Sequence, residues 1–165
     1  MLPPLLCRVS SCEKVGLDAK NNTYPSRSKV IHDMSSGMNP FVLLARITVK
    51  EGKLKDYLAI ASEVDSAVEA TEEGMLLHQL DTDPDDPNKL VWTEIYRRSE
   101  DFLIHADNPP VVDYVNQHQE LALDFTVEIY GNVSSAVLEK LQSLEVPCKH
   151  FRTTQIGYVR SERFC

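Results

Sequence analysis

The sequence predicts an α+β fold with the element order β-α-β-β-α-β, which is the ferredoxin-like split βαβ arrangement. Segments rich in apolar and β-branched residues alternate with segments whose apolar residues recur at helical spacing. A turn rich in proline and aspartate, TDPDDPN, joins the second predicted strand directly to the third. We therefore expect one such domain over residues 39–130, a disordered leader at 1–38, and a helix-strand extension at 131–165 that packs on the domain.

A change of period separates the first strand from the first helix. Residues 41–49 are mostly apolar or β-branched and are followed by Glu51 and Gly52, which is typical of a buried strand. Beyond Lys53 the apolar residues follow a helical period: Leu54, Tyr57, Leu58, Ala61, Val64 and Val68. Gly74 predicts the end of this helix.

The next two strands, MLLHQLDT and KLVWTEIY, form a predicted hairpin. Alternation along the second of them puts Trp92, Glu94 and Tyr96 on one face. We expect Trp92 and Tyr96 to join Val42 and Leu44 on the sheet face that the helices leave bare. An apolar face of that size predicts a partner.

Helix signals surround the fourth strand, DFTVEIYG. Ser99 predicts the cap of a short helix, and Pro110 predicts a second helical segment that continues to about Gln119. Beyond the strand, Ser134 predicts the cap of one more helix. The apolar residues of this helix are Val137, Leu141 and Leu144. The segment PCKHFRTTQIGYVR then predicts one or two further strands.

Charge and composition exclude several classes of partner. The net charge is −8, and residues 1–38 carry five basic and three acidic residues (+2), so the remainder carries −10. A body this acidic without a basic stripe argues against nucleic acid and membrane as partners. The four cysteines form no Cys-x-x-Cys motif, which favours a reduced, cytoplasmic setting. The leader could alternatively direct the chain to an organelle, or translation could begin at Met34 or Met38.

The combined segments LLARITVKEGKLKDYL, EEGMLLHQLDTDPDDPNKLVWTEIY and RRSEDFLIHADNPPVVDYV resemble the antibiotic biosynthesis monooxygenase (ABM) family over roughly residues 40–130. The resemblance implies a dimeric α+β barrel, in which two copies of the sheet join as a homodimer. It also implies a pocket between sheet and helices in each subunit. The resemblance further implies that the protein is an oxidoreductase of the monooxygenase type. Its substrate would be a small aromatic molecule, a phenol or hydroquinone, and it would use no metal or flavin cofactor.

His105 is the residue that we expect to be catalytic. An imidazole with an ordinary pKa near ~6.5 accepts a phenolic proton close to neutral pH. It lies one turn after Phe102 on the same helix face, so both side chains are predicted to point towards the sheet. The alternative is a buried structural histidine that orients the turn Asn108-Pro109-Pro110.

Further residues are expected to bind the substrate. Tyr96 occupies the family's aromatic position, Trp92 lies on the same strand face, and Phe102 accompanies His105. Arg46 either holds a substrate oxygen or pairs with Glu94 across the sheet. Tyr114 is the last candidate. It lies four residues before His118 on a predicted helix, so the two side chains either line the pocket entrance or form an exposed pair.

Three rival functions remain open. A heme-degrading branch of the family has an asparagine on strand one and a tryptophan at the end of strand three, where this sequence has Ala45 and Tyr96. An isomerase of small hydroxyketone phosphates shares the layout but requires basic residues that face the cavity. A dimer without catalytic activity that binds a small molecule is the third, because a fold does not determine a function.

Overall fold

The computed structural model describes residues 39–154 and 156–160. The predictions for the leader at 1–38 therefore lie outside the described residues. The elements, in chain order, are β1 (Phe41–Val49), α1 (Leu54–Thr71), β2 (Met75–Thr82), β3 (Lys89–Tyr96), α2 (Ser99–Asp107), α3 (Pro109–Leu121), β4 (Ala122–Tyr130), α4 (Ser135–Ser143) and β5 (Cys148–Phe151).

The strands form a single mixed sheet in the order β2-β3-β1-β4-β5. β1 pairs antiparallel with β3 and β4, and β2 pairs antiparallel with β3. These four strands have the ferredoxin-like order, so the predicted α+β fold class is confirmed. β5 adds to the outer side of β4 in parallel orientation.

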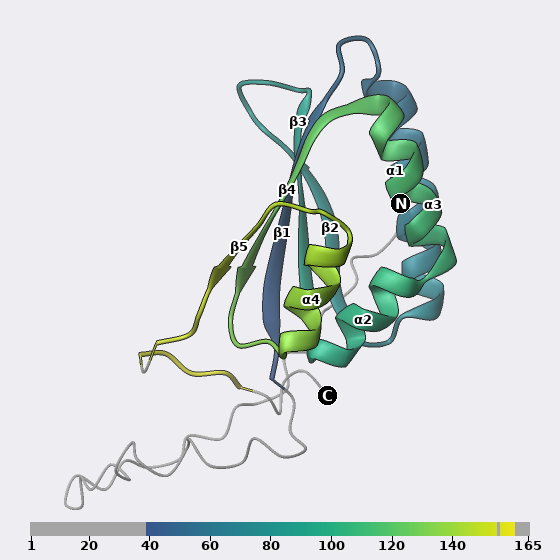
Figure 1. Cartoon of the computed structure of the whole chain (residues 1–165). Coiled ribbons are helices and arrows are strands. Elements are labelled where there is room, and N and C mark those ends of the chain that lie inside the picture. The colour runs from purple at the N-terminus through teal and green to yellow at the C-terminus, as the bar shows by residue number, and fades with distance from the viewer. Residues whose placement is uncertain (1–38, 155, 161–165) are drawn as a thin grey trace, which may run out of the picture. The chain divides into compact units, whose positions relative to one another are not determined.

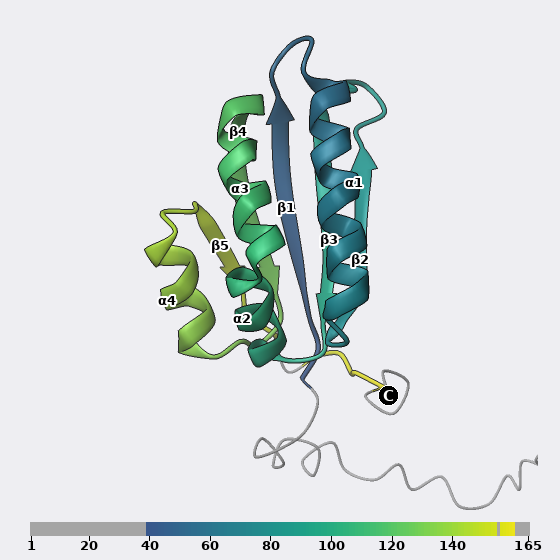
Figure 2. The same cartoon turned by 90° about the vertical axis from the view of Figure 1, so that its right-hand side faces the viewer.

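The four helices of the described residues, α1 to α4, lie on the same face of the sheet (Figures 1 and 2). α1 packs beside α3, and α2 packs beside both α3 and α4. Alternate residues of β1 point into this layer and are almost completely buried, including Phe41, Leu43 and Ala45. The core therefore lies between the helices and one face of the sheet, and this layer holds the site described below.

The predicted face of Trp92 and Tyr96 is wrong. Ala45 is the register partner of Trp92 and Phe41 that of Tyr96, so both aromatic side chains share the helix-covered face of β1. They are 4% and 0% exposed. The bare face instead carries the other parity of each strand, which includes the half-buried Val42.

The predicted serine caps are also wrong in detail. Neither Ser99 nor Ser134 makes a side-chain capping hydrogen bond at its own helix. Instead, the Ser99 hydroxyl accepts a hydrogen bond from the backbone N–H of Ser134 at 2.9 Å. This bond links the beginning of α2 to the beginning of α4, so the hydroxyl stabilises the contact between two helices.

The segment after β4 folds back onto the domain. Figure 2 shows α4 beside α2, with β5 continuing the sheet behind it. Val137 and Leu141 bury the inner side of α4, at 0% and 4% exposure. Within the described part of the chain, no helix is both long enough and apolar enough to cross a bilayer.

Candidate functional site

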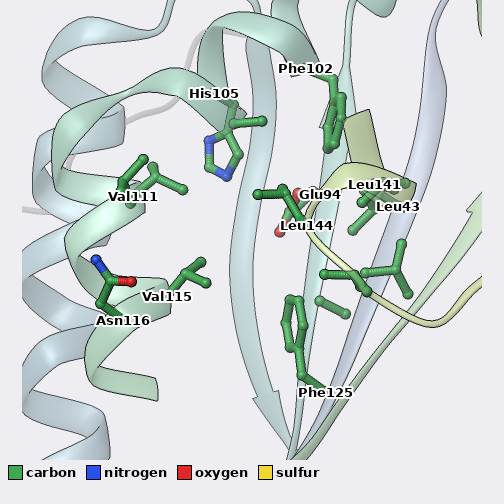
Figure 3. A pocket seen from close by; sticks show the side chains of 15 residues that line it. Leu43, Glu94, Phe102, His105, Val111, Val115, Asn116, Phe125, Leu141 and Leu144 are labelled. Carbon is green, nitrogen blue, oxygen red and sulfur yellow. The ribbon is translucent and has the colours of Figure 1, made fainter. Parts of the chain in front are cut away.

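A pocket lies between the helix layer and the sheet and has a volume of about 150 Å³. Fifteen residues line it, and twelve of them are apolar. The polar exceptions are Glu94 from β3, His105 from α2 and Asn116 from α3. Figure 3 shows the imidazole of His105 and the carboxylate of Glu94 pointing into the space between α3 and the sheet. A mostly apolar hollow with a few convergent polar groups is typical of small-molecule sites.

His105 is fixed in place by a buried carboxylate. Its Nδ1 lies 3.0 Å from an oxygen of Glu72, which follows α1 directly. The side-chain amide of Asn108 donates to the same carboxylate at 2.7 Å. Glu72 thus binds both the histidine and the Asn108 turn. His105 is therefore both a lining residue of the pocket, as the catalytic hypothesis requires, and part of the structure around the turn, as its alternative states.

The Glu72–His105 pair changes the pKa of both groups. Burial lowers the pKa of His105, but the hydrogen bond to Glu72 and the negative charges of Glu94 and Glu72 outweigh it, so the pKa is raised above 6.5. Burial raises the pKa of Glu72, but the hydrogen bond and charge of His105 outweigh it, and the pKa falls below 4.5. Each partner therefore favours the charged form of the other.

Glu94 is the second buried carboxylate of the pocket. It is 6% exposed and accepts a hydrogen bond from the Tyr96 hydroxyl at 2.5 Å. The Tyr96 ring itself packs edge-on against Phe102 and His105, with ring centroids 5.5 and 5.7 Å apart. Tyr96 thus lies directly behind the lining residues, orients Glu94 and supports the two lining rings.

Trp92 and Tyr114 belong to a separate buried cluster between α1, α3 and β3. The Trp92 indole N–H donates to the Tyr114 hydroxyl at 2.9 Å, and that hydroxyl is hydrogen-bonded to the hydroxyl of Tyr57. The Tyr57 hydroxyl also lies 3.0 Å from Nδ1 of His118. Burial raises the pKa of Tyr114 to about 12, although its hydrogen bonds with Tyr57 and Trp92 lower the pKa. Neither Tyr114 nor His118 is exposed, so the interpretation as an exposed pair is wrong.

Arg46 lies on the opposite face of the sheet. Its guanidinium contacts the carboxylate of Glu128 on β4 at 3.1 Å, and half of its side chain is exposed. The predicted pair between Arg46 and Glu94 is therefore wrong, because the two side chains project from opposite faces of the sheet. Of the six predicted site residues, the pocket is lined by His105 and Phe102.

Glu72 and Glu94 are not among the site residues that the sequence predicts. Glu72 lies 33 residues before His105 in the chain, and no motif spacing connects them. For Glu94 the sequence does contain a signal, because this residue shares one face of a predicted strand with Trp92 and Tyr96. A carboxylate on such a face needs a partner or a function.

The arrangement can accept and hold a proton. His105 uses Nδ1 for Glu72, which leaves Nε2 as its second proton-binding atom. Glu94 offers carboxylate oxygens in the same apolar space. A hydroxyl group on a bound ring would therefore find both a base and a hydrogen-bond acceptor, in surroundings that contain few other polar groups.

The comparisons with known proteins identify the fold. Residues 40–117 match the family described as antibiotic biosynthesis monooxygenase. No curated protein matches the sequence.

Solved structures with the same fold come from several bacteria. A proposed antibiotic biosynthesis monooxygenase from Bacteroides thetaiotaomicron is 22% identical, with a TM-score of 0.52, over 54% of this chain and 85% of that one. A Shewanella oneidensis protein is 24% identical, with a TM-score of 0.53, over 57% and 91% of the two chains. A proposed antibiotic biosynthesis monooxygenase from Caulobacter crescentus is 16% identical, with a TM-score of 0.55, over 59% and 92%.

Proposed function

We propose that this chain, whose residues 40–117 match the antibiotic biosynthesis monooxygenase family, is a cofactor-independent monooxygenase or quinol oxidase that acts on a phenolic or hydroquinone-type small molecule. The observation that carries the proposal is the apolar pocket in which His105, held by Glu72, faces the same space as Glu94. We keep the cytoplasm as the proposed location and a homodimer as the proposed assembly.

The first step of the proposed reaction is a proton transfer. Nε2 of neutral His105 accepts the proton of the substrate hydroxyl, and the resulting imidazolium is stabilised by Glu72. The substrate anion then supplies two electrons to dioxygen. A hydroquinone loses two protons and two electrons and becomes a quinone, while dioxygen becomes hydrogen peroxide. Where an activated CH₂ group is oxygenated instead, one oxygen atom forms the carbonyl and the other leaves as water.

The apolar walls contribute by excluding water. Phe102, Phe125 and the valines of α3 surround the place where the anion forms. In such surroundings the anion interacts with few groups other than His105 and dioxygen.

The lining of the pocket disfavours two of the rivals. Among the described residues, neither lysine nor arginine lines it, so a substrate phosphate would find no cationic partner there. Ala45 lies in the pocket wall where the heme-degrading branch has its asparagine. Both observations favour a neutral aromatic substrate.

The test is oxygen uptake with a panel of hydroquinones and anthrones. We expect uptake by the wild type with at least one substrate, and a rate about 100-fold lower for His105→Ala, because general-base catalysis contributes at least that much. His150→Ala is the matched control, because His150 lies on β5, where its Nε2 is within 2.9 Å of the Gly131 carbonyl oxygen. Its rate should equal that of the wild type.

Two outcomes would contradict the proposal. Equal rates for wild type and His105→Ala would remove His105 from the chemistry. No uptake with any substrate would favour the isomerase or the dimer without catalytic activity.

A further inference from the structure

We propose that α4 and the turn that follows it restrict the pocket to substrates with one aromatic ring, and that Leu144 sets this limit. The inference rests on the proposed function and names its substrate class. It concerns residues 131–165, which lie beyond the family match at 40–117.

The extension supplies one wall of the pocket. Leu141 on α4, Leu144 at its C-terminal end and Val146 after the turn all line the space opposite α3. Figure 3 shows Leu144 overlapping Glu94, with Leu141 and Leu43 to the right of it. These three are the lining residues that the extension contributes.

α4 is held at both of its ends, so this wall has a defined position. The Ser99 hydroxyl accepts from the N–H of Ser134 at the beginning of the helix. The ammonium group of Lys140 contacts the carboxylate of Asp107 near its end, at 2.5 Å. Both contacts reach α2, which carries His105.

The turn after α4 fixes Leu144. Glu145 has a φ of 56°, in the left-handed region, and the N–H of Val146 donates to the Leu141 carbonyl at 3.2 Å. A helix end of this kind reverses the chain and returns the next apolar residue to the core. Leu144 therefore lines the pocket while 45% exposed, which places it at the mouth, and Val146 packs against the core.

The volume of the pocket fits a single ring. An engineered apolar cavity of roughly 150 Å³ binds benzene, and this pocket has the same volume. A second fused ring requires more space. Leu144, at the mouth of the pocket, is the side chain whose truncation would provide that space. His105 and Glu94 then contact the hydroxyl groups of a phenol or hydroquinone whose ring fills the apolar part.

Binding of phenols in the absence of dioxygen tests the size limit without turnover. We expect calorimetry to give a dissociation constant for phenol about tenfold lower than for 1-naphthol, as for a hydrophobic pocket that rejects a larger ligand. Leu144→Ala should tighten 1-naphthol binding by about tenfold and change phenol binding little. Leu144→Trp should weaken phenol binding by a similar factor.

Leu58→Ala is the matched control, because Leu58 on α1 is 43% exposed and does not line the pocket. It should leave both dissociation constants unchanged. The size limit is overturned if the wild type binds 1-naphthol as tightly as phenol, if it binds neither, or if Leu144→Ala affects both ligands equally. The binding measurements and the oxygen-uptake measurements are independent. If the protein selects ligands by size but consumes no oxygen, only the proposed oxidation is refuted.

Discussion

At the scale of single residues, the Glu72–His105 pair determines how the site should depend on pH. The pKa of His105 is raised, so the imidazole must lose its proton before it can act as a base. We expect the rate of oxygen uptake by the wild type to rise with pH, with a midpoint above 6.5. Glu72→Gln removes the negative charge that raises this pKa and replaces one carboxylate oxygen with an amide NH₂ group, so the midpoint should move to lower pH. A pH series of initial rates measures both curves.

The same substitution should reveal the pair in the free energy of unfolding. A raised histidine pKa stabilises the fold below 6.5, and this stabilisation is lost as pH rises through the folded value. A lowered glutamate pKa stabilises the fold above 4.5 and is lost as pH falls. Glu72→Gln should therefore lose most stability between these values, about 1–3 kcal/mol. Glu73→Gln, at the exposed neighbouring position, is the control; an equal loss in both variants would argue against the pair.

Individual residues also show where sequence reasoning reaches its limit. The direction of His105 towards the sheet followed from its spacing to Phe102 along one helix. The partner Glu72 could not be predicted, because only the packing of α1 against the rest of the domain brings it close. Gly74 predicts the end of the first helix, but α1 already ends at Thr71. A Cβ at Gly74 would overlap the side chain of Asp101, so close packing is what requires a glycine there.

At the scale of elements, the hydrogen-bonded cluster of Tyr57, Tyr114, Trp92 and His118 joins α1 and α3 to the sheet. Tyr57→Phe removes the hydroxyl at its centre and leaves Nδ1 of His118 without this bond. We expect a loss of about 1–3 kcal/mol in the free energy of unfolding, because buried polar groups lose their partner. Chemical denaturation measures it.

Tyr130→Phe is the matched control for that measurement. Its hydroxyl donates to Glu128 at 3.0 Å on the surface of the sheet, and the residue is 38% exposed. The change should stay within about 0.5 kcal/mol. If both variants lost the same stability, the cluster would have no special role in joining α1 and α3.

Most element boundaries could be predicted, because apolar periodicity is strong in this sequence. β1, β2 and β3 begin and end where their patterns predicted. The face of β3 could not be predicted in the same way. Alternation groups Trp92 with Tyr96 on β3, and on β1 it sets a wholly apolar face apart from the face of Arg46 and Thr48. It does not say which face of β3 lies on the same side of the sheet as the apolar face of β1. The register between Ala45 and Trp92 decides it.

At the scale of the whole molecule, the bare face of the sheet is where the predicted homodimer would form. Ile95 and Val42 are register partners on this face, and both are half-buried. Ile95→Lys places a charge there, so we expect a wild-type dimer and a predominantly monomeric variant, because burying an unpaired charge is costly. Light scattering after gel filtration measures the mass of each. Ile104→Lys, on the 57% exposed Ile104 of α2, should leave the assembly unchanged; a monomeric wild type would refute the dimer.

The position of Trp92 has a practical consequence. It is the chain's single tryptophan, it is 4% exposed, and its ring stacks on that of His78 with centroids 4.0 Å apart. Indole fluorescence of the folded protein therefore originates at one dry spot where β2, β3 and α3 converge. Unfolding would shift that emission to longer wavelength. The molecule thus carries its own optical reporter and needs no added dye.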